Sequence, residues 1–357
     1  ASIQSLSASD TSSIPSTHFD VIIVDEFHHA GAETYAALLD HLKPKYLLGL
    51  TATPERHDGI DVLRWFGGRV SVELRLWDAL EQQLLAPFHY FGVSDGTDLR
   101  DVRWLRGRGY DAAELEQLYT ADDVWLRRVF EAVNRYVTDA SRMRAIGFCV
   151  SKRHAAFMAE RFSKAGLPSI AVTSDASAED RADALLALER GDVRVVFTVD
   201  LYNEGVDIPS VDVLLMLRPT ESATIFIQQL GRGLRRSDGK EVLTVLDFVG
   251  NHRAEFRFDQ KLIRLTGRTR PQLISDIEQD FPFLPPGCAI QFEREAQETV
   301  VRSLKKSIPT TLAPIRNALR EAGDVSLREF LERTGLDLLD FYGSDRSMTE
   351  LRSHLEL

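Results

Sequence analysis

The chain has 357 residues, of which 44% are apolar and 27% are charged. These proportions are those of an ordinary globular protein and exclude disordered and collagen-like classes. No run approaches the ~20 apolar residues that cross a bilayer, and the N-terminus lacks the features of a signal peptide. Two cysteines are too few for a disulfide framework or a cysteine zinc site, which predicts a cytoplasmic protein with no membrane segment and no structural zinc.

The net charge of −11 is unevenly distributed. Residues 1–140 carry −9, residues 141–270 carry +3 and residues 271–357 carry −5. Bulk charge therefore excludes a protein that coats nucleic acid along its whole length. Only the middle third could attract polyanions by its own field.

The first predicted elements are two strands around a helix. Phe19–Val24 is a continuous apolar, β-branched run, which predicts a strand buried on both faces, as in parallel sheets. Tyr35–His41 is helical, and Tyr46–Leu50 is a second buried strand. Next, residues 86–140 are expected to form a connector with a strand at Pro87–Val93 and helix around 122–137.

From Ala145 onward the predicted strands and helices alternate. The strands are 145–150, 169–173, 193–199, 211–217 and 241–249, and the helices are 152–165, 178–189 and 222–235. Such alternation predicts an α/β fold with parallel sheets covered by helices on both faces. After residue 270 we expect only helices. The predicted divisions are 1–85, 86–140, 141–270 and a C-terminal helical region, 271–357.

Two adjacent carboxylates, Asp25 and Glu26, end the first predicted strand, at the edge where open α/β sheets bind ligands. A Mg²⁺ ion held through one carboxylate and substrate phosphates explains the pair economically. Glu26 could then orient or deprotonate an attacking water. In isolation, an Asp-Glu pair that merely ends a strand is the better interpretation.

The segment Gln228–Arg235 places Arg232 and Arg235 three residues apart on one face of a predicted helix. Gly231 and Gly233 each cost about 1 kcal/mol in a helix interior, which suggests that the backbone approaches something closely. Paired arginines suit the stabilisation of transferred phosphoryl charge. The alternative is a solvated basic face with a packing glycine.

Five segments now stand in one order: Asp25–His28, Thr51–Pro54, Gly147–Ser151, Thr198–Pro209 and Gln228–Arg235. In this order they resemble motifs II to VI of superfamily 2 helicases of the DExH type. The resemblance covers residues 1–250 and implies two RecA-like domains, with residues 1–85 as the C-terminal half of the first and 141–270 as the second. It also implies ATP and Mg²⁺ as cofactors and a nucleic acid as partner.

The resemblance implies roles at the matching positions. Asp25 and Glu26 would hold Mg²⁺ and activate the hydrolytic water, and the γ-phosphate would contact Gln228, Arg232 and Arg235. The ribose would contact Gly205 and Asp207. Coupling between the nucleotide and the nucleic acid would use His28, Thr51 and Thr53. The nucleic-acid backbone would contact Ser5, Ser151, Thr173 and Thr198, without reading base sequence.

The chain departs from the family because it contains no Gly-x-x-x-x-Gly-Lys-Ser/Thr loop, and its only Gly-Lys pair is Gly239-Lys240. We therefore expect a fragment that lacks the N-terminal part of the same protein and is inactive alone. The alternative is a non-catalytic nucleic-acid or protein-binding module on a RecA-like scaffold. The region after the motor resembles, more loosely, bacterial helicases with a phospholipase-D-like domain before the motor and an uncharacterised domain after it.

Basic residues at Arg253, Arg257, Lys261, Arg264 and Arg268 would form one stripe if their segment were helical. Arg257 and Lys261 are therefore further nucleic-acid candidates, with a solvated face as the equal alternative. Trp104, between arginines, could stack on bases, although packing against a domain is the preferred interpretation. The style of motifs II and III favours DNA, and an RNA-directed member of the superfamily stays open.

Overall fold

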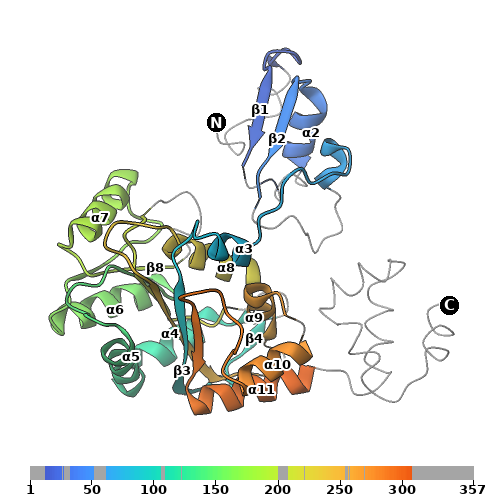
Figure 1. Ribbon diagram of the computed structural model, residues 1–357. Coiled ribbons are helices and arrows are strands. Elements are labelled where there is room, and N and C mark those ends of the chain that lie inside the picture. Colours follow the sequence, from blue (N-terminus) through green and yellow to red (C-terminus); the bar gives the residue numbers. More distant parts are fainter. Residues whose placement is uncertain are drawn as a thin grey trace, which may run out of the picture. The chain divides into compact units, whose positions relative to one another are not determined.

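The computed structural model describes residues 13–25, 27, 33–51, 62–105, 109–121, 123–199, 208–220, 222–253, 256, 258–268 and 270–307. They form two compact units, the first ending at Leu74 and the second beginning at Arg75 (Figure 1). Within these ranges, no helix has both the length and the apolar character that a membrane crossing requires.

The first unit contains two parallel strands, β1 (Val21–Val24) and β2 (Tyr46–Gly49), which pair from Val21–Tyr46 to Val24–Gly49. Helix α2 (Glu33–His41) connects them, and a 3₁₀ helix, η3 (Val62–Phe66), follows. Both strands and the helix were predicted from apolar runs and are confirmed.

The core of the first unit lies on one face of this sheet, where Val24 and Phe27 pack with Leu39. Gly49 permits the packing, because a Cβ there would lie 2.6 Å from Phe66 and 2.9 Å from Phe27. The prediction of a strand buried on both faces is wrong for the described residues. Ile23 is 61% exposed, because β1 alternates between the core face and an uncovered face.

The second unit is built on a seven-stranded sheet with the order β11-β3-β10-β9-β6-β8-β7, in which every pairing is parallel. The strands are β3 (Phe88–Asp98), β6 (Ala145–Phe148), β7 (Ser169–Ala171), β8 (Val195–Thr198), β9 (Val213–Met216), β10 (Leu243–Asn251) and β11 (Ala289–Phe292). This parallel sheet confirms the predicted α/β class. The carboxyl ends of all seven strands therefore lie at one edge.

Helices cover both faces of the sheet (Figure 1). They are α3 (Leu76–Glu81), α4 (Ala112–Ala121), α5 (Asp123–Tyr136), α6 (Lys152–Lys164), α7 (Ala178–Arg190), α8 (Ala223–Gly233), α9 (Phe258–Thr266), α10 (Arg270–Glu278) and α11 (Arg294–Ser307). Because crossovers between parallel strands are almost always right-handed, α4, α5 and α6 are expected on one face and α7, α8 and α9 on the other. In agreement, α4 contacts α5 and α6, and α8 contacts α9.

Local sequence explains where several of these helices begin and end. The Ser177 hydroxyl accepts a hydrogen bond from the Asp180 N–H at the start of α7, and the Asp180 carboxylate accepts one from the Ser177 N–H. This is a capping box. Gly191 ends the same helix with a φ of 79°, in the left-handed region that glycine tolerates. Ser222 caps α8 by accepting a hydrogen bond from the Ile225 N–H.

Two predictions about the connector and the tail need correction. The strand predicted at Pro87–Val93 exists as β3, but it pairs with β10 inside the central sheet. The expectation that strands stop after residue 270 is wrong, because β11 pairs with β3. Gly92 admits this edge strand, since a Cβ at Gly92 would lie 2.2 Å from the Phe292 ring.

Trp104 belongs to a small antiparallel hairpin formed by β4 (Trp104–Leu105) and β5 (Gly109–Tyr110). Its ring meets that of Tyr110 edge to face, with centroids 4.9 Å apart, and it packs against the core of the second unit. The preferred interpretation of Trp104 as a packing residue is confirmed.

Candidate functional site

In the first unit, Asp25 and Thr51 lie at the same edge of the sheet. Asp25 directly follows β1, and Thr51 comes two residues after β2, its parallel neighbour. The Phe27 N–H donates to the Leu50 carbonyl at 2.8 Å, which ties the segments after the two strands together. The Asp25 side chain is exposed. An exposed carboxylate at this edge fits a Mg²⁺ ion held through water.

Several predicted site residues lie outside the described residues. They are Ser5, Glu26, His28, Thr53, Gly205, Asp207 and Arg257. Their predicted roles stay predictions.

In the second unit, three predicted nucleic-acid contacts lie at the ends of neighbouring strands. Thr198 is the last residue of β8, Ser151 lies three residues after β6, and Thr173 lies two residues after β7. The sheet order β6-β8-β7 brings all three to one edge. The Ser151 hydroxyl also caps α6, since it accepts a hydrogen bond from the His154 N–H at 3.0 Å. Thr198 is fully buried, which speaks against a direct contact by its hydroxyl.

Helix α8 carries the predicted γ-phosphate contacts. Gln228 and Arg232 are four residues apart on one side of the helix, and both are half-buried. The helix ends at Gly233 with Leu234 as its C-cap, so Arg235 lies just beyond the helix and is exposed. The two arginines thus come from the last turn of α8 and the segment that follows it.

The two glycines of this segment have different roles. A Cβ on Gly233 would lie 2.3 Å from Leu243 of β10, so the close approach predicted for this glycine is confirmed. A Cβ on Gly231 would meet nothing within 4 Å among the described residues, and Gly231 is exposed. Packing therefore requires glycine only at the position where α8 lies on the sheet.

Lys240 supports this site, although the sequence alone did not predict that role. Its ammonium donates to the carbonyls of Gly233, of Arg235 at 3.0 Å and of Pro209 at 3.1 Å. A cation at this position suits the negative end of the helix dipole. Burial lowers the pKa of Lys240 to about 8, and Asp212 opposes that shift. A lysine shortly after a helix often donates to the last carbonyls of that helix, so this position was the sequence signal that could have predicted the contact.

A buried cluster of charged and polar side chains lies next to Phe226 of α8. The Lys261 ammonium and the Tyr90 hydroxyl both donate to the Asp247 carboxylate. Lys261 also lies 4.0 Å from the ring centroid of Phe258 and 5.7 Å from that of Phe226, a residue of α8. Burial lowers the pKa of Lys261, and Asp247 opposes that shift.

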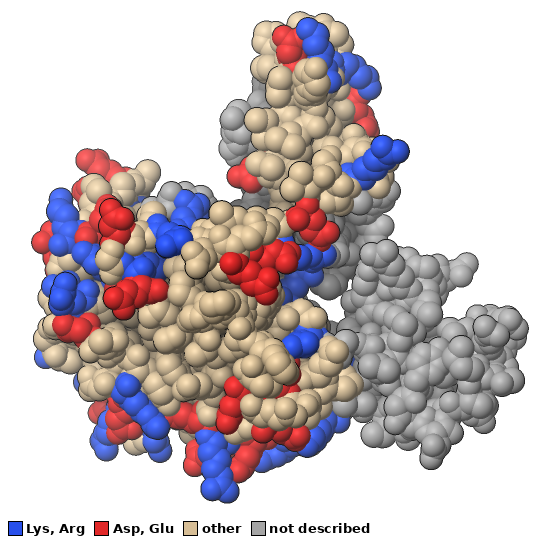
Figure 2. Space-filling model, viewed as in Figure 1, with Lys and Arg blue, Asp and Glu red and all other residues tan. Residues whose placement is uncertain are grey.

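The prediction that Lys261 contacts nucleic acid as part of a basic stripe is wrong. Lys261 is only 3% exposed and is neutralised by Asp247. Arg268 is paired with Asp276 at 3.0 Å, and Arg253 precedes α9 instead of lying on it. Figure 2 shows acidic and basic side chains interspersed over the visible face of the second unit. The face seen there shows no broad basic patch.

Two family models match the chain. The model for the res subunit of type III restriction enzymes matches residues 1–56, and the helicase conserved C-terminal domain matches residues 128–237. The first match contains Asp25 and Thr51, and the second contains Ser151, Gln228, Arg232 and Arg235. The two matches are thus similarities to a restriction-enzyme subunit and to a helicase domain, and they lie in two separate segments of the chain.

Individual relatives agree with these matches. IRC3 of Saccharomyces cerevisiae, a proposed ATP-dependent helicase, is 27% identical over 70% of this chain and 36% of its own length. The DNA 3'-5' translocase XPB2 of Sulfurisphaera tokodaii is 26% identical over 68% of this chain and 61% of its own length. The chain therefore spans less than two thirds of either relative.

Among solved structures, the fold is similar to that of the ATP-dependent type ISP restriction-modification enzyme LlaBIII bound to DNA. The TM-score is 0.54 at 15% identity, over 85% of this chain and 24% of the other. This likeness supports the RecA-like α/β architecture.

Proposed function

We propose that this chain is part of an ATP-dependent DNA translocase or helicase in which two RecA-like domains close on ATP and move along nucleic acid. One observation carries the proposal. The carboxyl edge of one parallel sheet presents Asp25 and Thr51, while Arg232 lies in the last turn of α8 and Arg235 in the segment just beyond it. The two family matches contain these residues, Asp25 and Thr51 in the first and Arg232 and Arg235 in the second.

In this proposal Asp25 and Glu26 hold Mg²⁺, which when bound neutralises charge on the ATP phosphates. Glu26 orients the water that attacks the γ-phosphate. Gln228, Arg232 and Arg235 contact the γ-phosphate from the second unit. Gly233 and Lys240 fix the end of α8, so the two guanidinium groups reach the nucleotide from a rigid support.

DNA is the proposed partner, because one relative is named as a DNA translocase and one solved relative is bound to DNA. Ser151 and Thr173 contact the strand backbone at the edge of the second sheet. The phosphate-binding loop comes from a longer protein of which this chain is a part. The 357-residue chain alone therefore hydrolyses ATP negligibly.

The test is ATP hydrolysis by that longer protein with single-stranded DNA present. Arg232→Ala and Arg235→Ala should each lower the rate by ~10³- to 10⁵-fold, as loss of an arginine finger does in related hydrolases. Arg236→Ala is the matched control, because Arg236 donates to the Gln83 carbonyl within its own unit. Equal rates in all three variants would exclude the proposed role of α8.

A further inference from the structure

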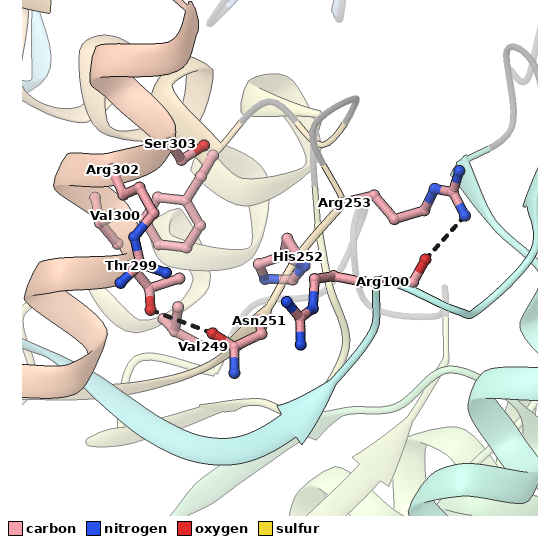
Figure 3. Close-up of a pocket in the computed structure, with 10 residues that line it drawn as sticks. Arg100, Val249, Asn251, His252, Arg253, Thr299, Val300, Arg302 and Ser303 are labelled. Atoms are coloured by element: carbon pink, nitrogen blue, oxygen red, sulfur yellow. Dashed lines mark hydrogen bonds between the residues drawn. The ribbon is translucent and has the colours of Figure 1, made fainter.

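A small pocket lies at the carboxyl ends of β3 and β10, under helix α11 (Figure 3). Its volume is about 110 Å³. Ten residues line it: Arg100, Val249, Asn251, His252, Arg253, Phe258, Thr299, Val300, Arg302 and Ser303. None of these ten is acidic, although the chain as a whole carries a net charge of −11. The pocket is therefore a local basic site on an acidic protein.

Helix α11 contributes one wall with repeated polar side chains. Thr299, Arg302 and Ser303 are spaced three and four residues apart, so they share one side of the helix. Figure 3 shows Arg302 and Thr299 reaching from α11 toward Asn251, with the Arg100 guanidinium on the other side of Asn251. Arg302 is exposed, and its guanidinium makes no ion pair or hydrogen bond with the described residues. Its donors are available to a ligand.

The opposite wall is held in place by Arg253. Its guanidinium donates to the carbonyl of Arg100 at 2.9 Å and to that of Val102 at 3.4 Å, so it joins the segment after β10 to the segment after β3. Figure 3 shows Arg253 directed away from the pocket and toward the Arg100 backbone. Arg253 thus positions Arg100 without itself facing the ligand.

The donors around the pocket match an oxyanion. The Arg100 guanidinium donates to both carboxylate oxygens of Asp98, from Nε at 2.8 Å and from Nη2, and this pairing lowers the pKa of the Asp98 carboxyl to about 2. The planar guanidinium retains further N–H groups. The Thr299 hydroxyl lies 3.5 Å from the Asn251 amide oxygen, which leaves the amide NH₂ as a donor. Guanidinium and amide N–H groups are donors that proteins use for phosphate.

The position of the pocket connects it to the predicted nucleic-acid contacts. All seven strands are parallel, so the ends of β3 and β10 lie at the same edge as Ser151 and Thr173. With about 4.8 Å between neighbouring strands, β10 lies roughly 10 Å from β6 and roughly 19 Å from β7. One strand of nucleic acid along this edge could contact both places.

We propose that the pocket between Arg100, Asn251 and Arg302 binds a backbone phosphate of single-stranded nucleic acid and extends the contact surface beyond the conserved motifs. This inference rests on the proposed function. The contact is with the backbone, so it adds affinity and fixes the path of the strand without base specificity.

The experiment measures binding of fluorescein-labelled oligothymidylate to the 357-residue chain by anisotropy at several salt concentrations. Arg302→Ala and Arg100→Ala should each raise the Kd by about five- to ten-fold. Loss of one phosphate contact should also lower the slope of log K against log salt by about 0.7. Arg302→Lys should lose less, because it keeps the charge. Unchanged thermal unfolding would show that each variant is folded.

Arg294→Ala is the matched control, since Arg294 is exposed on the same helix but pairs with Glu298 at 3.2 Å and does not line the pocket. Wild-type-like Kd and salt slope in both pocket variants would overturn the inference while leaving the proposed function intact. Failure of the wild-type chain to bind the oligonucleotide would overturn the inference, whereas the proposed function is tested separately by ATP hydrolysis in the longer protein. If inorganic phosphate bound in the pocket while both pocket variants bound DNA like the wild type, the pocket would be assigned to a free anion. That result would overturn the nucleic-acid assignment.

Discussion

Gly231 and Gly233 provide a matched pair of perturbations on helix α8, because alanine should change stability in opposite directions at the two positions. At Gly233 the added Cβ would lie 2.3 Å and 2.8 Å from the methyl carbons of Leu243. Leu243 is fully buried in β10, so its side chain can move only by displacing neighbouring core side chains. Overpacking of this kind costs about 1–3 kcal/mol, of which the better helix propensity of alanine offsets up to ~1 kcal/mol.

At Gly231 the same methyl group meets nothing within 4 Å among the described residues. Gly231 is exposed and helical, so alanine should stabilise the second unit by roughly 0.5–1 kcal/mol. The two variants should therefore differ by roughly 0.5–3 kcal/mol. For a unit of this size that difference corresponds to roughly 1–12 °C in Tm.

The assay is thermal unfolding followed by circular dichroism, with urea denaturation as the second measurement. The expected order of stability is Gly231→Ala, then wild type, then Gly233→Ala. Shifts of the same sign in both variants would refute the argument that α8 is held against β10 at Gly233 alone.

Three further predictions concern buried groups of the second unit. Burial lowers the pKa of His154 from 6.5 to about 3. The free energy of unfolding should therefore fall by on the order of 5 kcal/mol as the pH drops from 6.5 toward 3. In urea titrations, His154→Leu should lose less stability over this pH range than the wild type. Lys261→Met should destabilise the fold by about 3–5 kcal/mol, because it leaves the Asp247 carboxylate buried without its cation. Adding Asp247→Leu should recover most of that loss, and equal denaturation midpoints for the single and double variants would contradict the ion pair's role. Cys149 is fully buried and burial raises its thiol pKa, so Ellman's reagent should label it only after unfolding, whereas Cys288 is partly exposed and should react in the native chain; rapid labelling of both thiols would contradict the model of the core.

The strands and helices from Ala145 to Asn251 follow from local patterns. Their apolar runs are buried on both faces of a parallel sheet, and a continuous run needs no knowledge of distant residues. Strand β11 has four residues and mixed polarity, and it depends on Gly92, about 200 positions earlier, to admit Phe292. Such a non-local requirement leaves no signal within the strand itself.

The candidate site divides in the same way. Motif order predicts Asp25, Thr51, Arg232 and Arg235 as site residues. Parallel pairing of β1 and β2 explains why Asp25 and Thr51 lie at the same edge of their sheet. The spacing of basic residues wrongly predicted that Lys261 is exposed. Helical spacing places Lys261 on one side of the helix but does not show that this side meets a buried acidic partner, Asp247, on another element.

The pocket that we propose binds a backbone phosphate combines Arg100, Asn251 and Arg302 from three distant segments. Only the folded sheet brings those segments together. Lys240 was visible in the sequence as part of a Gly-Lys pair, but its three carbonyl partners depend on the packing of α8. The sequence therefore offers candidate residues through its motifs, whereas the supporting contacts become visible only in the folded structure.

The most direct test of the central claim is the rate of ATP hydrolysis by the longer protein as single-stranded DNA is added, with RNA and no nucleic acid as comparisons and the 357-residue chain measured alongside. The account predicts hydrolysis that DNA stimulates more strongly than RNA, and no turnover by the chain alone. Hydrolysis that is independent of nucleic acid, or no hydrolysis by the longer protein, would contradict it.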